Sequence, residues 1–143
     1  MDNGKVVFEK IKENAIIPSK QHENDVGYDI FSIEDDTLKS GDIKLIGTGL
    51  KMSLPKNLEA QIRPRSGLAL SGVIVPNSPG TIDPGYRGEL KVILGNIGSE
   101  EIKIEKGDRI AQLIFSKIAH PELSEGKVEE TERGENGFGS TGK

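Results

Sequence analysis

Glycine divides this sequence into short apolar runs, and this pattern limits the folds that the chain can adopt. Eighteen of the 143 residues are glycine, and few stretches have apolar residues at helical spacing. Short apolar runs bounded by Gly, Asp or Pro are typical of strands. Such runs occupy residues 6–8, 28–32, 43–46, 50–54, 58–63, 72–76, 89–94, 102–104 and 110–118. Many short strands with regular breaks predict an all-β sandwich, barrel or jelly roll.

Local patterns add detail to this interpretation. Residues 101–105, Glu-Ile-Lys-Ile-Glu, alternate as a half-buried strand does, and Lys106-Gly107-Asp108 predicts a hairpin turn directly after them. The one helical candidate is the short segment 66–70. At 143 residues the chain is expected to form one domain that buries roughly two-thirds of its unfolded surface.

Composition and charge exclude several classes of function. The chain has no Cys, which excludes disulfides, thiolate metal sites and a cysteine nucleophile. His22 and His120 are its only histidines, too few for a histidine metal centre or a Ser-His-Asp triad, and both are expected on the surface or in loops. With a net charge of −4 and scattered Lys and Arg, we expect no direct binding of nucleic acid. Neither a membrane-length apolar run nor a signal-peptide pattern is present, so the sequence predicts a soluble, cytoplasmic protein without a membrane partner.

The last part of the sequence differs in composition from the rest. Residues 121–132 are acidic and polar, which predicts an extended linker, and residues 133–143 are rich in glycine with one large apolar residue, Phe138. We therefore divide the chain into a β jelly-roll core, residues 1–120, and a linker with a C-terminal arm, residues 121–143. Such an arm is either a disordered terminus or a segment that wraps phosphate with N–H groups, hydroxyls and positive charge.

The segment Gly80-Thr81-Ile82-Asp83-Pro84-Gly85-Tyr86-Arg87-Gly88 places one carboxylate, Asp83, on a tight turn between two apolar runs. Tyr86 follows three residues later. An exposed carboxylate beside an aromatic ring favours a general base next to a flat substrate. An ordinary Asp-Pro-Gly turn produces the same pattern, because Pro fixes φ and Gly accepts a positive φ. On this segment alone, both interpretations stay open.

Five segments, taken in chain order, resemble the five motifs of the trimeric dUTP nucleotidohydrolase (dUTPase) family. They are Val26-Gly27-Tyr28-Asp29, Pro64-Arg65-Ser66-Gly67-Leu68-Ala69, residues 80–88, Gly107-Asp108-Arg109-Ile110-Ala111-Gln112-Leu113-Ile114 and residues 133–142. The resemblance covers nearly the whole chain and implies a jelly-roll subunit of a three-fold homotrimer with three shared active sites. In the family, the first, second and fourth motifs come from one subunit and the third from a neighbour, while the arm closes a site on another subunit.

The resemblance implies an enzyme that hydrolyses dUTP to dUMP and pyrophosphate with Mg²⁺, lowering dUTP relative to dTTP and supplying dUMP for thymidylate synthesis. Asp83 resembles the general base that activates water for in-line attack on the α-phosphorus. Asp29 resembles the carboxylate that positions the metal-bound triphosphate through water. Tyr86 is similar to the ring that stacks on the deoxyribose and excludes a ribose 2′-hydroxyl, and the alternative is a plain core aromatic.

The second and fourth motifs imply the phosphate contacts. Arg65, Ser66 and Gly67 are similar to a clamp that supplies forked donors, a hydroxyl and an unobstructed N–H. Gln112 matches a contact to the α-phosphate, and a solvent-facing Gln at a sheet edge is the alternative. Asn77 lies where the family recognises uracil. The other substrate-binding positions expected in this region are Gly80, Thr81, Ile82 and Lys91.

The C-terminal arm supplies the fifth motif. Phe138 resembles the ring that stacks over the bound uracil, and Arg133, Gly139, Ser140 and Thr141 match positions that hold the β- and γ-phosphates. Because a glycine-rich arm loses much entropy on ordering, we expect it to close as a lid only over the whole triphosphate.

Some residues and three other functions stay open. Arg63 and Arg87 receive no role. Asp108 and Arg109 are not expected to be catalytic residues, and the alternative is a structural ion pair beside the turn. The nearest alternative function is a dCTP deaminase on the same fold, but Glu89 lacks the neighbours expected of its catalytic Glu. The others are a nucleotide-binding regulator without turnover and a structural jelly-roll protein without a ligand.

Overall fold

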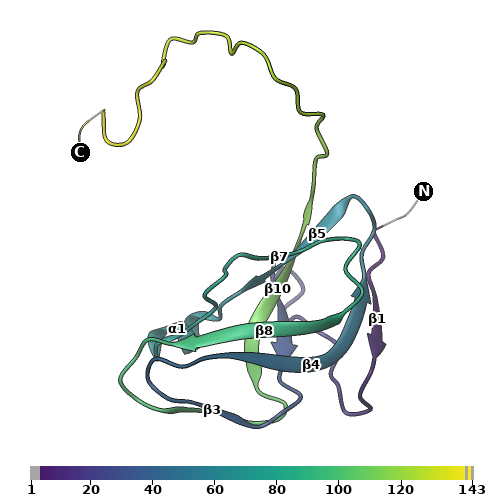
Figure 1. Cartoon of the computed structure of the whole chain (residues 1–143). Coiled ribbons are helices and arrows are strands. Elements are labelled where there is room, and N and C mark those ends of the chain that lie inside the picture. Colours follow the sequence, from purple (N-terminus) through teal and green to yellow (C-terminus); the bar gives the residue numbers. More distant parts are fainter. Residues whose placement is uncertain (1–3, 141, 143) are drawn as a thin grey trace.

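Ten strands and one short helix make up the described part of the chain (Figure 1). The computed structural model describes residues 4–140 and residue 142. In chain order the elements are β1 (Val7–Lys10), β2 (Tyr28–Phe31), β3 (Asp36–Leu38), β4 (Ile43–Ser53), β5 (Leu58–Arg63), α1 (Ser66–Leu70), β6 (Val73–Ile74), β7 (Gly80–Ile82), β8 (Glu89–Asn96), β9 (Ile102–Ile104) and β10 (Arg109–Lys117).

The strands form two four-stranded sheets and one two-stranded ribbon. One sheet has the order β1-β4-β8-β6, the other has the order β2-β10-β5-β7, and β3 pairs with β9. All of these pairings are antiparallel. Buried side chains from both four-stranded sheets belong to one core cluster, so the two sheets pack together as a sandwich. The prediction of an all-β, jelly-roll fold is confirmed.

The core follows from the alternation of side chains along the strands. On β8, Leu90, Val92 and Leu94 are buried, whereas Lys91 between them is exposed. The other sheet contributes Leu113 of β10, which is fully buried. Each fully buried Leu or Val stabilises the fold by about 1.5–3 kcal/mol. The packed core thus fixes the positions of the strands, and the strands fix the positions of the polar residues at their ends and in the loops.

Strand β4 is longer than the sequence predicts. Separate strands were expected at residues 43–46 and 50–54, but both ranges fall in the single strand β4 or directly after it. Gly47 and Gly49 lie inside the strand, where its register against β8 shifts. Gly49 has a φ of +72°, a conformation that residues with a side chain rarely adopt. The two glycines therefore belong to a bulge and do not end the strand.

Of the other local predictions, the helix is confirmed, two strands were missed, and the predicted hairpin is wrong. The helix predicted at residues 66–70 is confirmed as α1. Strands β3 and β7 gave no sequence signal, because Asp36-Thr37-Leu38 and Gly80-Thr81-Ile82 each contain only one large apolar residue and so show no alternation. The turn at residues 106–108 forms, with the Asp108 N–H donating to the Glu105 carbonyl at 2.9 Å. It is not a hairpin, because β9 pairs with β3, and β10 pairs with β2 and β5.

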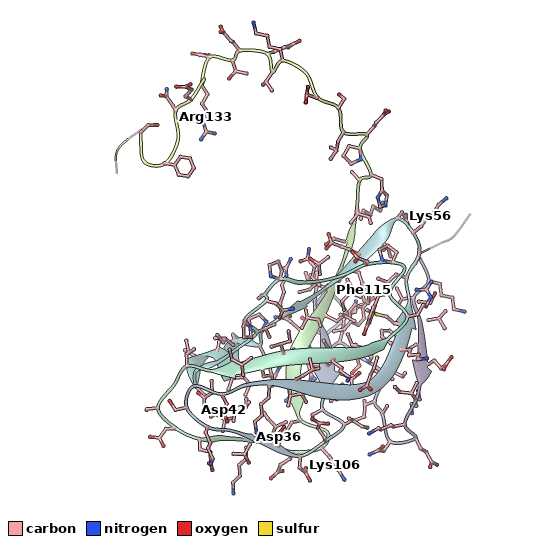
Figure 2. All side chains as sticks on the ribbon, viewed as in Figure 1. Asp36, Asp42, Lys56, Lys106, Phe115 and Arg133 are labelled. Carbon is pink, nitrogen blue, oxygen red and sulfur yellow. The ribbon has the colours of Figure 1, made fainter. Side chains whose placement is uncertain are left out.

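Beyond β10 the chain leaves the sandwich as a long arm (Figure 1). Its described residues after Lys117 contain no helix or strand. Two contacts hold the base of the arm. The Ile118 N–H donates to the Asn57 carbonyl at 3.0 Å, and His120 Nε2 lies 3.3 Å from the Lys56 carbonyl oxygen. Figure 2 shows this base close to Lys56, with the rest of the arm curving away from the sandwich.

Candidate active site

Two hollows collect the predicted site residues of the sandwich. The first, called here the β7 cavity, has a volume of about 290 Å³. Its lining includes Asn77, Gly80, Thr81, Ile82, Asp83, Tyr86 and Lys91. The second, called here the Arg65 hollow, has a volume of about 170 Å³. It is lined by Asp29, Arg65, Ser66, Gly67 and Gln112. The two linings have no residue in common.

The Arg65 hollow forms where the central sheet strands meet the start of α1. Because β10 lies between β2 and β5, Gln112 on β10 pairs directly with Asp29 on β2. Strand β5 ends on the other side of Gln112, and Arg65 occupies the N-cap position of α1. Ser66 and Gly67 form the first turn of that helix. Strand pairing and one tight connection thus bring three separate motifs to the same place.

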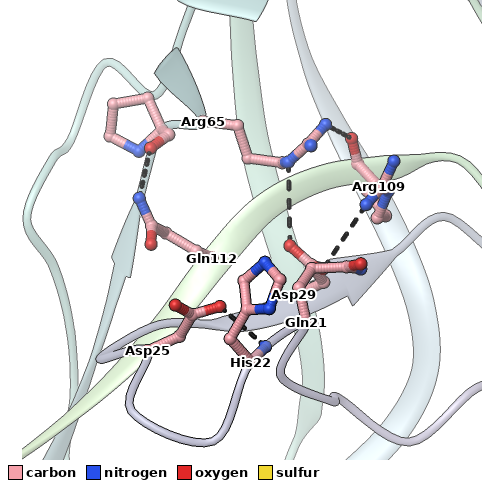
Figure 3. Close-up of polar contacts among 8 residues, drawn as sticks. Gln21, His22, Asp25, Asp29, Arg65, Arg109 and Gln112 are labelled. Carbon is pink, nitrogen blue, oxygen red and sulfur yellow. Dashed lines mark hydrogen bonds and ion pairs between the residues drawn. The ribbon is translucent and has the colours of Figure 1, made fainter. Parts of the chain in front are cut away.

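Asp29 is the centre of the polar contacts in this hollow (Figure 3). Its side chain is 13% exposed, with Oδ1 3.7 Å from Arg65 Nε and Oδ2 3.8 Å from Arg109 Nη1. Gln21 Nε2 donates to Oδ2 at 2.9 Å, and Arg65 Nη1 donates to the Arg109 carbonyl at 3.2 Å. The carboxylate therefore holds two guanidinium groups close together, and one of them, Arg65, lines the hollow.

These contacts correct one prediction and add a residue. Arg109 pairs with Asp29, so the predicted ion pair with Asp108 is wrong. Asp108 Oδ2 instead accepts the Glu105 N–H at 2.8 Å and supports the turn before β10. Gln21 gave no sequence signal, because it lies in a polar loop outside every motif and reaches Asp29 only in the folded chain.

Gln112 depends on a glycine beside it. Its Nε2 donates to the Pro64 carbonyl at 2.9 Å, which ties β10 to the residue before Arg65. A Cβ atom on Gly27 would lie 2.0 Å from Gln112 Oε1, so only glycine leaves room for this side chain as it stands. Gln112 is half-buried on a central strand, and the alternative of a solvent-facing Gln at a sheet edge is wrong.

The β7 cavity is bordered by the turn that joins β7 to β8. The Tyr86 N–H donates to the Asp83 carbonyl at 3.1 Å, which closes the turn. Arg87 Nη1 donates to the carbonyls of Pro84 and Tyr86, at 2.6 and 3.1 Å. Arg87, which received no role from the sequence, thus holds the backbone between Asp83 and Tyr86. The Asp83 side chain is exposed at the cavity, where a solvent molecule can reach it.

Tyr86 is a cavity residue and not a core aromatic. Its side chain is 47% exposed, which contradicts the core alternative. Its hydroxyl donates to the Glu89 carbonyl at 2.8 Å. A Cβ atom on Gly88 would lie 2.3 Å from this hydroxyl oxygen, so the ring lies against a glycine. Elsewhere in the cavity lining, a Cβ atom on Gly80 would lie 2.8 Å from Asn77 Nδ2, which packs the amide closely against β7.

The predicted arm residues are not in either hollow. Phe138 is fully exposed, and Arg133 Nε donates to the Asn136 carbonyl within the arm at 2.8 Å. Gly139 has a φ of +87°, and the Ser140 N–H donates to the Gly137 carbonyl at 3.0 Å. Thr141 lies outside the described residues. In this single chain the arm is thus apart from the other predicted site residues.

Residues 4–140 and 142 lack two other features. Among them, no group of three or more His, Cys, Asp or Glu side chains is arranged to hold a metal ion. No helix in this part of the chain is long and apolar enough to cross a membrane. Asp29 is the one carboxylate among the residues that line the Arg65 hollow.

Comparison with known proteins gives one consistent result. The dUTPase family model matches residues 13–142. The deoxyuridine 5′-triphosphate nucleotidohydrolase of Clostridium novyi is 56% identical over 140 residues, covering 96% of this chain and 99% of that protein. The enzyme of the same name from Clostridium acetobutylicum is 51% identical, covering 94% of each.

Solved structures agree with the sequence relatives. The dUTPase of Staphylococcus bacteriophage 80alpha with dUPNHPP has a TM-score of 0.89 at 30% identity, covering 96% of this chain and 98% of that one. A mutant dUTPase from phage phi11 of S. aureus, described with a structural Mg(II) ion, has a TM-score of 0.79 at 28% identity, covering 90% and 99%. These matches favour a dUTP-hydrolysing enzyme over the deaminase, the regulator and the structural protein. The chain therefore belongs to the dUTPase family and is a dUTP diphosphatase.

Proposed function

We propose that the two hollows are complementary halves of one dUTP site, and that each complete site forms between copies of the chain in a homotrimer. The observation that carries this proposal is that the two hollows are lined by different kinds of chemical groups. The β7 cavity is lined mostly by aliphatic, aromatic and amide groups, with Asp83 and Lys91 among them, whereas the Arg65 hollow offers cationic and N–H donors beside Asp29. A nucleoside and a triphosphate need these two kinds of surface.

The nucleoside half of dUTP occupies the β7 cavity. Asn77 and the backbone of β7 supply hydrogen-bond partners for the edge of uracil, and the cavity wall rejects the extra methyl of thymine. Tyr86 covers the deoxyribose where a ribose would carry its 2′-hydroxyl. Lys91, exposed on β8 at the cavity, adds a positive charge on the path toward the phosphates.

The triphosphate occupies the Arg65 hollow. Arg65 supplies a charged fork of donors, Ser66 a hydroxyl, and Gly67 an N–H, with open space at the position where a side chain would begin. Gln112 contacts the α-phosphate. One N–H of its amide is already used on Pro64, which leaves the second N–H to donate.

The residues present fit a Mg²⁺ ion that arrives with the substrate. Mg²⁺ usually keeps several waters and takes its other ligands from substrate phosphates and one or two carboxylates. Asp29 is such a carboxylate at the edge of the phosphate hollow, and it would hold the ion through water. When bound, the ion neutralises charge on the phosphate oxygens during the reaction. The contacts of Asp29 with Arg65 and Gln21 keep the carboxylate in place.

Asp83 is the proposed general base. It takes a proton from a water whose oxygen forms a bond to the α-phosphorus of dUTP. In the same in-line displacement, the bond from the α-phosphorus to the oxygen shared with the β-phosphate breaks, so dUMP and pyrophosphate are formed. The exposed position of Asp83 on a turn held by Arg87 supports this role.

The C-terminal arm, residues 121–143, closes a site on another subunit, while residues 1–120 form the core. Phe138 covers the uracil, and Arg133 with Gly139, Ser140 and Thr141 binds the β- and γ-phosphates. An exposed Phe at the end of an arm that leaves its own sandwich supports this arrangement. Closure excludes water other than the attacking one. The cytoplasmic location stays a prediction from the sequence.

The experiment that tests this proposal is pyrophosphate release from dUTP, dTTP, dCTP and UTP with Mg²⁺. Turnover is expected with dUTP alone and is expected to fall by about 100-fold or more in Asp83→Asn. Asp25→Asn, which changes a carboxylate that lines neither hollow, serves as the control. A non-hydrolysable dUTP analogue should still raise the melting temperature of Asp83→Asn. Full activity in that variant would show that Asp83 is not the base.

A further inference from the structure

Glu89 makes contacts that the proposed reaction does not use. It is the first residue of β8, is half-buried and lines the β7 cavity. Its Oε2 accepts the backbone N–H groups of Thr48 and Gly49, at 3.2 and 3.1 Å. These N–H groups lie in the β4 bulge, where the shift in register takes them out of the regular strand pairing. The carboxylate therefore satisfies backbone donors that the sheet does not.

The fit between Glu89 and the bulge is close. A Cβ atom on Gly47 would lie 2.6 Å from Glu89 Oε2, so this glycine makes room for the carboxylate. Next to it, the buried Thr48 hydroxyl donates to the Leu90 carbonyl. Hydrogen bonds from N–H groups to a charged acceptor are about twice as strong as those between neutral groups. The start of β8 is thereby anchored to β4.

The main chain of the same residue holds Tyr86. The tyrosine hydroxyl donates to the Glu89 carbonyl at 2.8 Å, and the ring lies against Gly88. The Glu89 side chain thus holds Glu89 in place against β4, and the Glu89 carbonyl in turn holds the Tyr86 ring. No such link is visible in the sequence, because the bulge lies about forty positions before Glu89.

We propose that Glu89 is a positioning residue that sets the discrimination between deoxyribose and ribose by holding the Tyr86 ring. This inference rests on the proposed function, in which Tyr86 covers the sugar. Exclusion of one hydroxyl requires a wall that does not yield, since a ring that moves by a fraction of an ångström admits the larger sugar. In this role Glu89 acts through the bulge and the Tyr86 ring.

The test compares kcat/KM for dUTP and for UTP in the wild type, Glu89→Ala and Glu89→Gln. The preference for dUTP over UTP is expected to fall about five- to tenfold in Glu89→Ala. It should be largely restored in Glu89→Gln, whose amide oxygen still accepts both N–H groups. The matched control is Asp42→Ala, which removes a carboxylate that accepts the Lys39 N–H at 2.8 Å and does not line the cavity. The control should lose stability and keep its preference.

A double-mutant cycle with Tyr86→Phe separates this role from a general loosening of the sheet. Tyr86→Phe removes the hydroxyl and leaves the bulge intact, so it should lower the preference by itself. Adding Glu89→Ala should then change the preference little, because both changes break the same link. If the two changes lower the preference for dUTP additively, the inference is overturned. An unchanged preference in Glu89→Ala would overturn it as well. Should Glu89→Ala not fold, an unchanged preference in Tyr86→Phe would do the same. A wild type that does not prefer dUTP would overturn the proposed function itself.

Discussion

Replacing Gly27 with Ala tests how the phosphate half of the site is built. The new Cβ would lie 2.0 Å from Gln112 Oε1 and 3.2 Å from Gln112 Cβ. The end of the flexible Gln112 side chain must therefore move, and Gln112 Cβ must give way by a few tenths of an ångström. When the amide moves, it leaves the Pro64 carbonyl, to which it now donates at 2.9 Å. It also leaves the position proposed for contact with the α-phosphate.

Gly27→Ala should lower the activity toward dUTP more than it lowers the stability of the fold. The lost hydrogen bond to Pro64 contributes about 0.5–1.5 kcal/mol to folding. In a chain of this size that loss lowers the melting temperature by roughly 2–6 °C. A hydrogen bond to a charged phosphate contributes about 1.5–3 kcal/mol, and its loss lowers kcat/KM for dUTP by about 10- to 100-fold.

The assays are thermal unfolding and steady-state dUTP hydrolysis of Gly27→Ala beside two controls. Gly126→Ala adds a Cβ where nothing lies within 4 Å and should change neither quantity. Gln112→Ala removes the side chain that the new methyl would displace, so Gly27→Ala should have little further effect in that background. The reasoning is refuted if Gly27→Ala matches the wild type, or if its effect is equally large without the Gln112 side chain.

Two further predictions concern pH and the arm. Lys44 Nζ lies 2.9 Å from Asp36 Oδ1, and this hydrogen bond lowers the pKa of Asp36 below its ordinary 3.8 and raises the pKa of Lys44 above its ordinary 10.5. Because the pKa of Asp36 is lower in the folded state, its contribution is present above pH 3.8 and is lost as the pH falls through the folded pKa, while that of Lys44 is lost only in strong alkali. In urea unfolding, Asp36→Asn should be slightly less stable at neutral pH and should approach the wild type in acid; an equal gap at every pH would contradict this. Removal of residues 133–143 should abolish most turnover and leave the melting temperature without substrate unchanged, because the described hydrogen bonds of residues 131–142 all lie within that segment. Full activity of the truncated chain would contradict the lid.

Local chemistry made much of the fold predictable. Gly, Asp and Pro mark strand ends because they favour turns, and this signal placed α1 and most strands near their observed positions. It failed inside β4, where Gly47 and Gly49 serve a bulge that exists only because β8 lies alongside. It also failed for β3 and β7, which each contain one large apolar residue and owe their strand structure to their partners.

The candidate site divides in the same way. Asp83 and Arg65 stand in motifs whose residue types and spacing carry the signal, so the sequence identified them. Three features were missed: the contact of Gln21 with Asp29, the ion pair between Arg109 and Asp29, and the anchoring role of Glu89. Each depends on groups that only the folded chain brings together, Gln21 from a loop and the others through strand pairing, and one sequence does not specify those contacts.

The central claim is that each site combines the β7 cavity of one subunit with the Arg65 hollow of another. It is tested most directly by mixing two inactive variants, Asp83→Asn and Arg65→Ala, in equal amounts through joint unfolding and refolding. Both keep their arms, and each damages a different half of the site.

In a random trimer, a site is intact when the subunit that supplies the β7 cavity carries the Arg65→Ala change and its neighbour carries Asp83→Asn. The mixture should therefore recover about one quarter of the wild-type dUTP hydrolysis per chain. Each variant refolded alone should stay inactive. If the mixture is as inactive as its components while mixed trimers are present, both halves act within one chain, and the shared site is refuted.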